Sequence, residues 1–442
     1  MTEILAKQKR RDFLKRFSAG IIAGSAFLPI IDRKPSVASI REFKEQLAQH
    51  AGQGAIDDEK FWNLIRLQFP LNSDLIYMNT GGLGPSPYAV MNTFERQMFD
   101  LEQISETGHD FVESVRQKAA LFFHCDPDEI AFTRNATEGM NLIARGLPLR
   151  RNDEVVMTTH EHPGGAIPWL ALANDIGIKI KLFEPGQSDA ENLERIEAQL
   201  TAKTKVVMIS HVTCTTGQIL PARAIADLCH RNNIWLVLDG AQVPGMLPVD
   251  LHALECDFYT SSGHKWLCGP KGTGFLFVRK NLLDTWRINH VGAHSDKRYV
   301  LDELSFVPQR VAKGTEYGTR NTPLIIALGA AIDFFDTIGM ERVAARDRSL
   351  AAYLKHQLAQ LKNVELLTPP DPQLSGGMVT FRISGKLPKH SDYITEIKQR
   401  FNIRLRPVGE HGLNAIRASL HIFNTLEQVD QLVNAVKDLA SS

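Results

Sequence analysis

The chain has 442 residues, 43% hydrophobic and 23% charged, which is the composition of a soluble globular protein large enough for two domains. Lysine plus arginine equals aspartate plus glutamate at 50 each, so no net basic charge attracts nucleic acid, and we expect a small-molecule substrate. The five cysteines are scattered and lack the paired spacing of a zinc site or a disulfide framework, so we expect them to be reduced.

The first forty residues have the order of a twin-arginine export signal. Arg10 and Arg11 precede an apolar run from Phe17 to Ile31, which is shorter than the roughly 20 residues that span a membrane. Small residues ending at Ala38 give the expected cleavage site, with residues 39–76 left as an N-terminal arm. We therefore expect an exported, periplasmic protein. A basic amphipathic helix is the alternative.

Short apolar strands alternate with amphipathic helices between residues 77 and 331, the predicted large domain. The strands are near-continuous runs of Val, Ile, Leu, Met and Phe, which indicates burial on both faces. Such alternation predicts an α/β fold with a mostly parallel sheet between layers of helices. Predicted strands are Glu129–Thr133, Glu154–Thr159, Ile178–Phe183, Val206–Ser210, Ile234–Asp239, Phe258–Ser261 and Thr273–Val278, and predicted helices include Pro163–Asn174, Asn192–Leu200 and Pro221–Arg231.

Residues 332–442 show a different order of elements and predict a smaller α+β domain. Asn424, with Glu427 three residues later, predicts the N-terminal cap of the last helix. The predicted elements are a long helical stretch Ile332–Leu361, strands Val364–Leu367, Met378–Ile383, Ile403–Pro407 and Asn414–Leu420, and a final helix Thr425–Leu439.

A lysine follows the predicted strand Phe258–Ser261, in the run from Ser262 through His264 and Lys265 to Pro270. A lysine that forms a Schiff base is held at a strand end, partly desolvated, so that its amine can be neutral. Lys265 has this setting. A surface turn that happens to contain one lysine is the alternative.

An aspartate ends the strand that lies about two dozen residues earlier. Asp239 follows five apolar residues, and a carboxylate at the end of a buried parallel strand needs a cationic partner. The N–H of a protonated pyridine is such a partner, and it makes pyridoxal 5'-phosphate (PLP) an electron sink. Gln242 is near enough in sequence to reach the phenolic oxygen of this cofactor. The alternatives are a helix cap or metal ligand for Asp239 and a solvent-facing turn residue for Gln242.

A third element has the pattern of an anion site at a helix N-terminus. Asn135 is the expected cap, with Glu138 three residues later. The first amides of the helix, those of Ala136 and Thr137, are then expected to be free for a phosphate, which the helix dipole favours. Any capped helix offers such donors.

The order and spacing of these elements resemble the class V aminotransferase family of fold-type I PLP enzymes, from about Phe61 onward. The resemblance is to the isopenicillin N epimerase-like branch and, more distantly, to the cysteine desulfurases. It implies that Lys265 carries PLP as a Schiff base and that Asp239 holds the pyridine nitrogen. It also implies that His162 stacks on the pyridine ring, against the alternatives of a helix-start histidine or a metal site with His160. We expect no metal, because further ligands are not evident.

The resemblance also implies which residues bind the phosphate of PLP and that a second subunit contributes to the site. Ser262 and His264 are expected to bind the phosphate beside Ala136 and Thr137. Thr319, after Gly318, matches a segment that reaches the phosphate of the neighbouring subunit in this family. We therefore expect a homodimer with shared active sites.

Arg417 matches the arginine that binds the substrate carboxylate in a bidentate pair, for which a guanidinium is suited. Taken alone, such an arginine is more often part of a surface ion pair.

The chain departs from the desulfurases at two places. Cys214 follows the run His211–Val212–Thr213 where many desulfurases have an asparagine that contacts the cofactor oxygen, a contact that Thr213 or Gln242 alone would replace. The stretch 407–416 holds His411 but no nucleophilic cysteine, so sulfur abstraction is not expected, although Cys214 and Cys268 stay open as reactive thiols.

These features predict a PLP-dependent enzyme that acts on the amino group of an amino acid or an amino-acid-derived substrate. Transamination or related chemistry is the first expectation. An epimerase or racemase and a β-lyase are the alternatives, because these reactions share the first carbanion. A catalytically inactive binding protein that retains the fold is the non-enzyme alternative.

Overall fold

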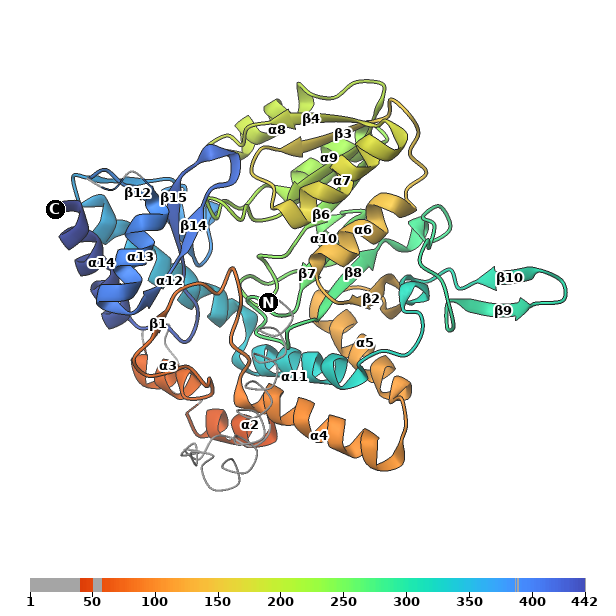
Figure 1. The fold of residues 1–442 in the computed structure, drawn as a ribbon, viewed down its shortest axis with the longest axis horizontal. Helices are drawn as coiled ribbons and strands as arrows, with labels where there is room; N and C mark the ends of the chain where they lie inside the picture. Colours follow the sequence, from red (N-terminus) through yellow and green to blue (C-terminus); the bar gives the residue numbers. More distant parts are fainter. Residues whose placement is uncertain (1–39, 51–57, 386, 388, 442) are drawn as a thin grey trace, which may run out of the picture. The chain divides into compact units, whose positions relative to one another are not determined.

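The computed structural model describes residues 40–50, 58–385, 387 and 389–441. A seven-stranded sheet in the order β2-β8-β7-β6-β5-β3-β4 forms its largest layer (Figure 1). Neighbouring strands run parallel except at β8, which is antiparallel to both β2 and β7. The predicted α/β class is confirmed. The strands are β2 Ile130–Thr133, β3 Glu154–Thr158, β4 Lys179–Phe183, β5 Thr204–Ser210, β6 Trp235–Asp239, β7 Phe258–Ser262 and β8 Gly274–Val278.

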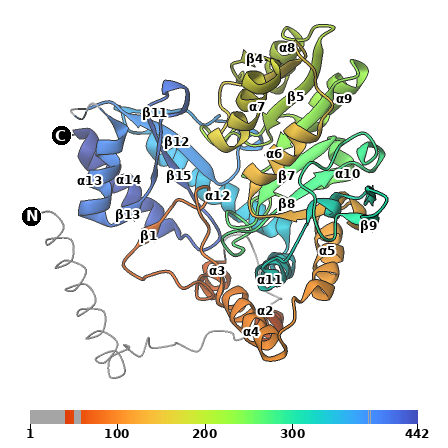
Figure 2. The ribbon, with the colours of Figure 1, turned by 45° about the vertical axis from the view of Figure 1, so that its right-hand side comes forward.

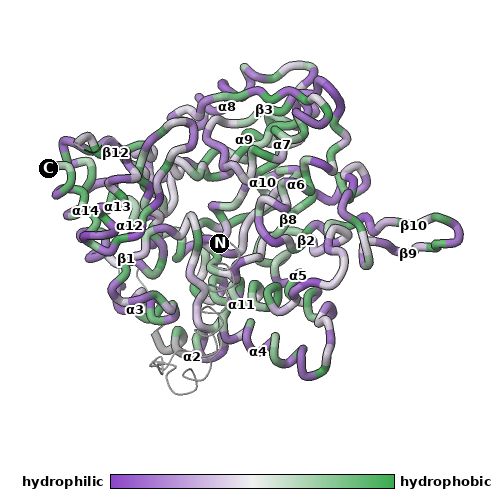
Figure 3. The backbone as a smooth tube through the Cα atoms, viewed as in Figure 1, coloured by the Kyte–Doolittle hydropathy of each residue, from purple (hydrophilic) through white to green (hydrophobic). Residues whose placement is uncertain are grey.

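Helices pack on this sheet, as its apolar strands require. Helix α6 contacts β7 and β8, α7 contacts β4, and α9 contacts β6 (Figure 1 and Figure 2). Helix α11, whose buried residues are almost all apolar (Figure 3), packs against α4 and α5. The helices up to this point are α2 Ile40–His50, α3 Glu59–Arg66, α4 Tyr88–Ile104, α5 His109–Phe123, α6 Ala136–Gly146, α7 Pro163–Ile176, α8 Asp189–Glu197, α9 Ala222–Arg231, α10 Leu251–Leu254 and α11 Thr322–Ile338.

A second, four-stranded antiparallel sheet in the order β11-β12-β15-β14 has its own hydrophobic core. The short strand β1 (Ile76–Tyr77) pairs in parallel with β13 and brings the following loop beside this sheet. Strands β9 (Asp296–Val300) and β10 (Ser305–Pro308) form a hairpin that extends away from the larger sheet (Figure 1). The remaining elements are α12 Met340–Ala359, β11 Val364–Leu366, β12 Met378–Ile383, α13 His390–Phe401, β13 Ile403–Arg404, β14 Arg406–Val408, β15 Ala415–Ser419 and α14 Leu426–Ser441.

Three sequence expectations in this part are wrong. The single helical stretch Ile332–Leu361 is two helices, α11 and α12, bent by 79°. The break is at Gly339, whose φ of +90° a side chain would strain. The predicted strand Ile403–Pro407 is divided into β13 and β14. Asn424 does not cap the last helix: its Oδ1 accepts from His421 N at 2.9 Å, and Thr425 Oγ1 accepts from Gln428 N at 3.2 Å.

The expected export signal and its cleavage site at Ala38 lie outside the described residues. Within the described residues, no single helix is long and apolar enough to cross a membrane, although the bent pair of α11 and α12 passes on length and composition together. The five cysteines are free of disulfides, as expected. In the described part of the chain, no group of three or more His, Cys, Asp or Glu residues could hold a metal ion.

Candidate active site

The lysine turn, residues 263–269, follows β7 and is held by the loop that follows β1. Gly84 N donates to His264 O at 2.7 Å. A Cβ atom at position 84 would lie 1.9 Å from Lys265 O, so only glycine fits there. Lys265 is half-buried. Burial lowers the pKa of its amine, which favours the neutral, nucleophilic form.

Asp239 is the last residue of β6 and is buried beside the lysine. Because β6 and β7 are parallel neighbours, their carboxyl ends meet at one edge of the sheet. Ala241 N donates to Asp239 Oδ1 at 2.9 Å and fixes the carboxylate. The charge of Asp239 raises the pKa of Lys265 and partly opposes the effect of burial.

The amide of Gln242 has a defined orientation. Trp266 Nε1 donates to Gln242 Oε1 at 2.8 Å, and an indole N–H can only donate. Gln242 Nε2 donates to Gly81 O at 3.0 Å. The second hydrogen of this nitrogen can therefore serve an acceptor in the site, which fits the expected contact to the phenolic oxygen of PLP.

The phosphate end is built by β7 and the first turn of α6. Asn135 caps this helix as predicted, since its side chain accepts from Glu138 N at 2.9 Å. Ala136 N, however, donates to Ser262 Oγ at 3.1 Å, so the expectation that this amide is free is wrong. The reason is that β7 places Ser262 directly against the helix start. Because Ser262 accepts this bond, its own hydrogen can donate to an anion.

Two further residues expected at the phosphate lie nearby. Thr137 is the next residue of α6 and is exposed. His264 is half-buried, and its Nδ1 atom is buried without a hydrogen-bond partner. Burial and the neighbouring Lys265 charge lower the pKa of His264. An unpartnered ring nitrogen beside Ser262 is the feature that an incoming phosphate oxygen would satisfy.

His162 begins α7, where its Nδ1 accepts from Gly164 N at 3.0 Å. A nitrogen that accepts carries no hydrogen, so the ring is neutral with its hydrogen on Nε2. Burial first, and then the charge of Lys265, lower the pKa of His162. A neutral imidazole at this position suits stacking on a pyridine ring.

Glu161, beside His162, is a candidate that the sequence analysis did not single out. Its side chain is buried and accepts from Thr158 Oγ1 at 2.7 Å, Ser210 N at 3.0 Å and Ser210 Oγ at 2.7 Å. Burial raises the pKa of Glu161 to about 7, and Asp239 adds to the shift. This carboxyl therefore contributes to the electrostatics behind Asp239. Only its place next to His162 could have marked it in the sequence.

Arg417 enters the site from β15. Its side chain is buried, and Nη1 donates to Cys214 O, while Nε and Nη2 have no partner. These two atoms form one edge of the guanidinium, the fork that binds a carboxylate in a bidentate pair. Burial lowers the pKa of Arg417 to about 10. Its cross-strand neighbour Arg406 is already paired with Glu410. Because Glu410 already pairs with Arg406, the Nε and Nη2 atoms of Arg417 are open to a bound anion.

Other unpartnered polar atoms gather beside Arg417. Ser419 Oγ, Asn79 Oδ1 and Thr80 Oγ1 are buried without hydrogen-bond partners. Asn79 and Ser419 are bridged in parallel. A Cβ atom placed on Gly81 would lie 3.0 Å from both Arg417 Nη2 and Ser419 Oγ, so the side chains converge there. The set has the polarity of a binding site, and not of a packed core.

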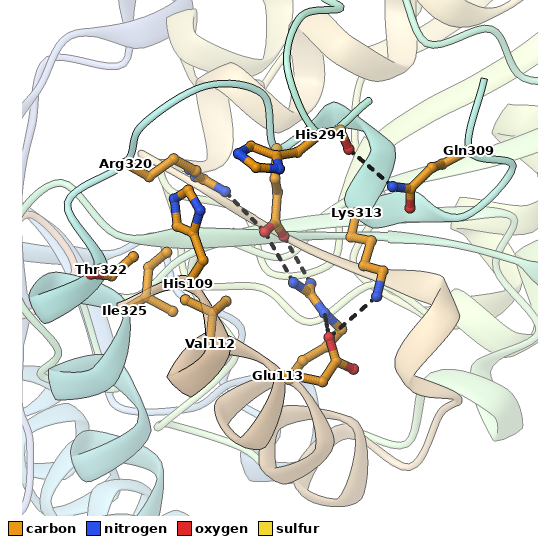
Figure 4. A pocket seen from close by; sticks show the side chains of 11 residues that line it. His109, Val112, Glu113, His294, Gln309, Lys313, Arg320, Thr322 and Ile325 are labelled. Carbon is orange, nitrogen blue, oxygen red and sulfur yellow. Dashed lines mark hydrogen bonds and ion pairs between the residues drawn. The ribbon is translucent and has the colours of Figure 1, made fainter. Parts of the chain in front are cut away.

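Thr319 lies apart from these residues. It is exposed and lines a pocket of about 830 Å³ that Lys265 and Asp239 do not line. The segment before it is fixed by a buried ion pair of Arg116 and Glu316, in the neighbouring pocket shown in Figure 4. Glu316 Oε1 also accepts from Phe132 N at 2.6 Å, which ties this segment to β2. The structure thus places Thr319 near the start of α6 but outside the group of residues around Lys265 and Asp239.

The thiols and Thr213 are poorly suited to chemistry in this structure. Burial raises the pKa of Cys214 to about 11 and that of Cys268 well above its usual range. Thr213 Oγ1 accepts from Gln218 N at 3.0 Å and is close to Thr216 Oγ1 at 2.8 Å, so it serves its own turn. This leaves Gln242, whose Nε2 has a second hydrogen to donate, as the expected replacement for that asparagine.

Comparison with known proteins identifies the class. In solved structures, the cystine C–S lyase C-DES in complex with its product cysteine persulfide matches with a TM-score of 0.78 and 29% identity over 84% of this chain and 100% of that one. A C-DES mutant with glycine covalently linked to the PLP cofactor matches with a TM-score of 0.78 and 28% identity over 85% and 99%. The fold is thus that of the fold-type I PLP enzymes.

Residues 92–432 match the family described as Aminotransferase class-V, and the protein belongs to this family. An isopenicillin N epimerase of Amycolatopsis lactamdurans is 30% identical over 396 residues, which are 86% of this chain and 98% of that protein. A probable cysteine desulfurase of Synechocystis sp. is 29% identical over 402 residues, 84% of this chain and 94% of that protein. The resemblance drawn from the sequence is confirmed, and PLP is the cofactor.

The residues present fit this cofactor. Lys265 offers an amine whose pKa burial lowers, Asp239 a fixed carboxylate at the same sheet edge, and His264 Nδ1 an unsatisfied buried atom at the phosphate end. The open fork of Arg417 is left over for a substrate group.

Proposed function

We propose that the protein acts on the amino group of an α-amino acid whose carboxylate is free, and that its reaction is transamination. The observation that carries the carboxylate in this proposal is the open Nε and Nη2 fork of the buried Arg417 in the neighbourhood of Lys265, and the description of the matching family, Aminotransferase class-V, supports transamination. A buried guanidinium with two unpartnered nitrogens is costly unless an anion binds them in the working state.

The chain's own residues then have the following roles. PLP, when bound, supplies an electron sink for the carbanion at the substrate's Cα. The Lys265 amine would remove the proton from Cα and redeliver it, because burial lowers its pKa and so favours the neutral form. Asp239 would keep the proton on the pyridine nitrogen. His162 would cover one face of the ring, and Gln242 Nε2 would donate to the phenolic oxygen.

A second candidate is β-elimination. The similarity to the cystine C–S lyase favours it, together with the buried, high-pKa thiols of Cys214 and Cys268. Elimination needs no protein thiol, whereas the persulfide chemistry of desulfurases does. Epimerisation is the reaction of the isopenicillin N epimerases to which the chain is similar. Like transamination and elimination, it would begin with removal of the Cα proton by Lys265.

The test incubates the PLP-loaded protein with a panel of L- and D-amino acids and analyses the products. A 2-oxo acid without ammonia, with transfer of the amino group to the cofactor, supports transamination. Ammonia release with loss of the β-substituent contradicts it in favour of elimination, and the mirror-image amino acid assigns epimerisation. No turnover of any member, with PLP bound at Lys265, would favour the inactive binding protein.

We also propose that the protein is a homodimer in which Thr319 reaches the phosphate of the partner. Its exposure, and its place in a pocket that Lys265 and Asp239 do not line, support this arrangement. Mixing a Lys265→Ala protein with a Thr319→Tyr protein tests it, because only mixed dimers would combine an intact lysine with an intact Thr319. Recovery of activity on mixing is expected. Two monomeric proteins in sedimentation would contradict the proposal.

Export through the twin-arginine machinery, to the periplasm, is a further proposal, supported by Arg10 and Arg11 ahead of the apolar run. Replacing both arginines with lysine should leave the full-length precursor in the cytoplasm, while the unaltered protein is recovered outside it, shortened near Ala38. The same distribution of both forms would reject this route.

A further inference from the structure

Four consecutive carbonyl oxygens of the lysine turn each accept one hydrogen bond. Three donors are backbone amides, and two of these lie inside the turn itself. The fourth donor is the side chain of His421, which lies two residues after the end of β15 and so outside both the turn and the loop that follows β1. The pairs are Gly263 O with Gly269 N at 2.7 Å, His264 O with Gly84 N at 2.7 Å, Lys265 O with Cys268 N at 3.0 Å and Trp266 O with His421 Nε2 at 2.9 Å.

The His421 ring has no freedom to turn away. It is fully buried, stacked on Phe335 with ring centroids 5.6 Å apart and edge-on to Trp266 at 5.2 Å. Its Nδ1 lies 2.8 Å from Oδ2 of Asp347, which is also fully buried, on α12. Both ring nitrogens are therefore engaged.

The two contacts define the protonation of the pair. A carbonyl oxygen only accepts, so His421 Nε2 carries a hydrogen. Nδ1 and Asp347 Oδ2 then share one proton, as imidazolium with carboxylate or as neutral ring with protonated acid. Both forms have zero net charge, so the pair adds no net charge to the interior. Burial raises the pKa of Asp347 to about 6, which helps the pair to retain this proton.

We propose that Asp347 and His421 are a positioning pair that fixes the backbone at Trp266 and thereby aims the Lys265 amine at the cofactor. This inference rests on the proposed role of Lys265. Asp347 orients the ring, and the ring holds the carbonyl that directly follows the lysine. In this proposal the pair itself contacts neither PLP nor substrate.

The same pair also acts on the contact expected at the phenolic oxygen of PLP. Trp266, whose carbonyl His421 holds, donates its indole N–H to Gln242 Oε1. This bond decides which end of the Gln242 amide faces the site. A shift of Trp266 would therefore disturb both the lysine and the donor expected at the phenolic oxygen.

The test measures how fast borohydride fixes PLP to Lys265, which reports the lysine–cofactor bond independently of turnover. His421→Phe keeps an aromatic ring but removes the donor. It should slow fixation and lower kcat by about tenfold, the effect of one lost buried hydrogen bond, while KM changes by less than about threefold. His421→Gln, whose amide can donate to Trp266 O, should recover most of the loss.

Asp347 gives a second, independent series. Asp347→Asn can donate to His421 Nδ1 and should fix PLP within about twofold of the unaltered rate, whereas Asp347→Leu should slow fixation several-fold. This series applies if His421→Phe does not fold. The matched control is His390→Gln, because His390 is also buried and its Nε2 accepts from Ile383 N, remote from the lysine turn.

Normal fixation by a folded His421→Phe protein, or by a folded Asp347→Leu protein, would overturn the proposal. So would an equal loss in His390→Gln, since this would indicate a general effect of stability. If the unaltered protein is not labelled at Lys265, the proposed function itself fails, and this outcome is recognised before any variant is compared.

Discussion

The two sides of the site differ in how their polar groups are satisfied. On the cofactor side, Asp239, Gln242 and Ser262 already have partners within the protein, although His264 Nδ1 at the phosphate end is buried without one. On the substrate side, around Arg417, polar atoms of Ser419, Asn79 and Thr80 are buried without any. Most polar groups of the cofactor side are thus held by the protein itself, whereas those of the substrate side await a bound group.

The energetic consequence of this difference is large. An unpartnered buried polar group costs about 1–3 kcal/mol, and more when it is charged. The substrate side carries several such atoms close together. A carboxylate bound there would offset this cost, which is why the difference between the sides indicates where selectivity for the substrate resides.

Breaking the cofactor side should have the largest effect. Asp239→Asn should retain PLP but lose turnover by roughly 100-fold or more, the scale of a lost proton-transfer advantage, because a neutral amide does not hold the pyridine proton. Steady-state kinetics with the absorbance spectrum of bound PLP measure both quantities. The matched control is Asp257→Asn, because Asp257 is also buried but accepts from Leu236 N and His230. Near-normal turnover of Asp239→Asn would show that its role is wrong.

Breaking the substrate side should alter affinity more than the chemical step. A charge-assisted bidentate contact contributes about 1.5–3 kcal/mol, so Arg417→Ala should raise KM for α-amino acids by roughly tenfold to a hundredfold. Arg417→Lys should recover only part of this, since an ammonium lacks the planar fork. Amines without a carboxylate should be unaffected. Unchanged amino-acid kinetics, with Arg404 or Arg406 essential instead, would place the carboxylate elsewhere.

The two sides also differed in how far the sequence could predict them. Asp239 and Lys265 each lie at or just after an apolar run, and parallel strands bring such ends together, so local pattern was sufficient. The strands of the larger sheet were predictable for the same reason. Arg417 was found only by resemblance, because no local feature distinguishes it from an arginine in a surface ion pair. Its open fork is visible only once the loop after β1 and β15 lie side by side.

Long-range contacts account for the features that the sequence missed. Ser262 Oγ accepts from the amide of Ala136 because β7 passes the start of α6. This contact cannot be predicted from the spacing of residues in the sequence. His421 and Asp347 are distant in sequence, and neither lies in a motif. The cap at Asn424 was misplaced because that side chain closes a turn with His421, so that Thr425 caps the helix instead.

The smallest expected effect concerns the electrostatics behind the cofactor side, at Glu161. Burial raises the pKa of this carboxyl from an ordinary value of 4.5 to about 7. The folded state therefore binds the proton more tightly than the unfolded state, and Glu161 favours folding below about pH 4.5. This contribution is lost as the pH rises to about 7, for a total of roughly 3 kcal/mol as an order of magnitude.

Glu161→Gln should remove this part of the pH dependence. A glutamine stays neutral, and the hydroxyls of Thr158 and Ser210 can turn to accept from its amide. Thermal unfolding of the PLP-free protein should show stability falling between about pH 6 and pH 7 in the unaltered chain and less so in the variant. Burial raises the pKa of Asp347 to about 6, so the stability that this carboxyl contributes is lost as the pH rises to about 6, below the pH window measured here. Glu154→Gln is the control, because hydrogen bonds lower the pKa of Glu154. Equal slopes for the unaltered protein and Glu161→Gln would mean that Glu161 is ionised in the fold, and that Asp239 has a second negative charge behind it.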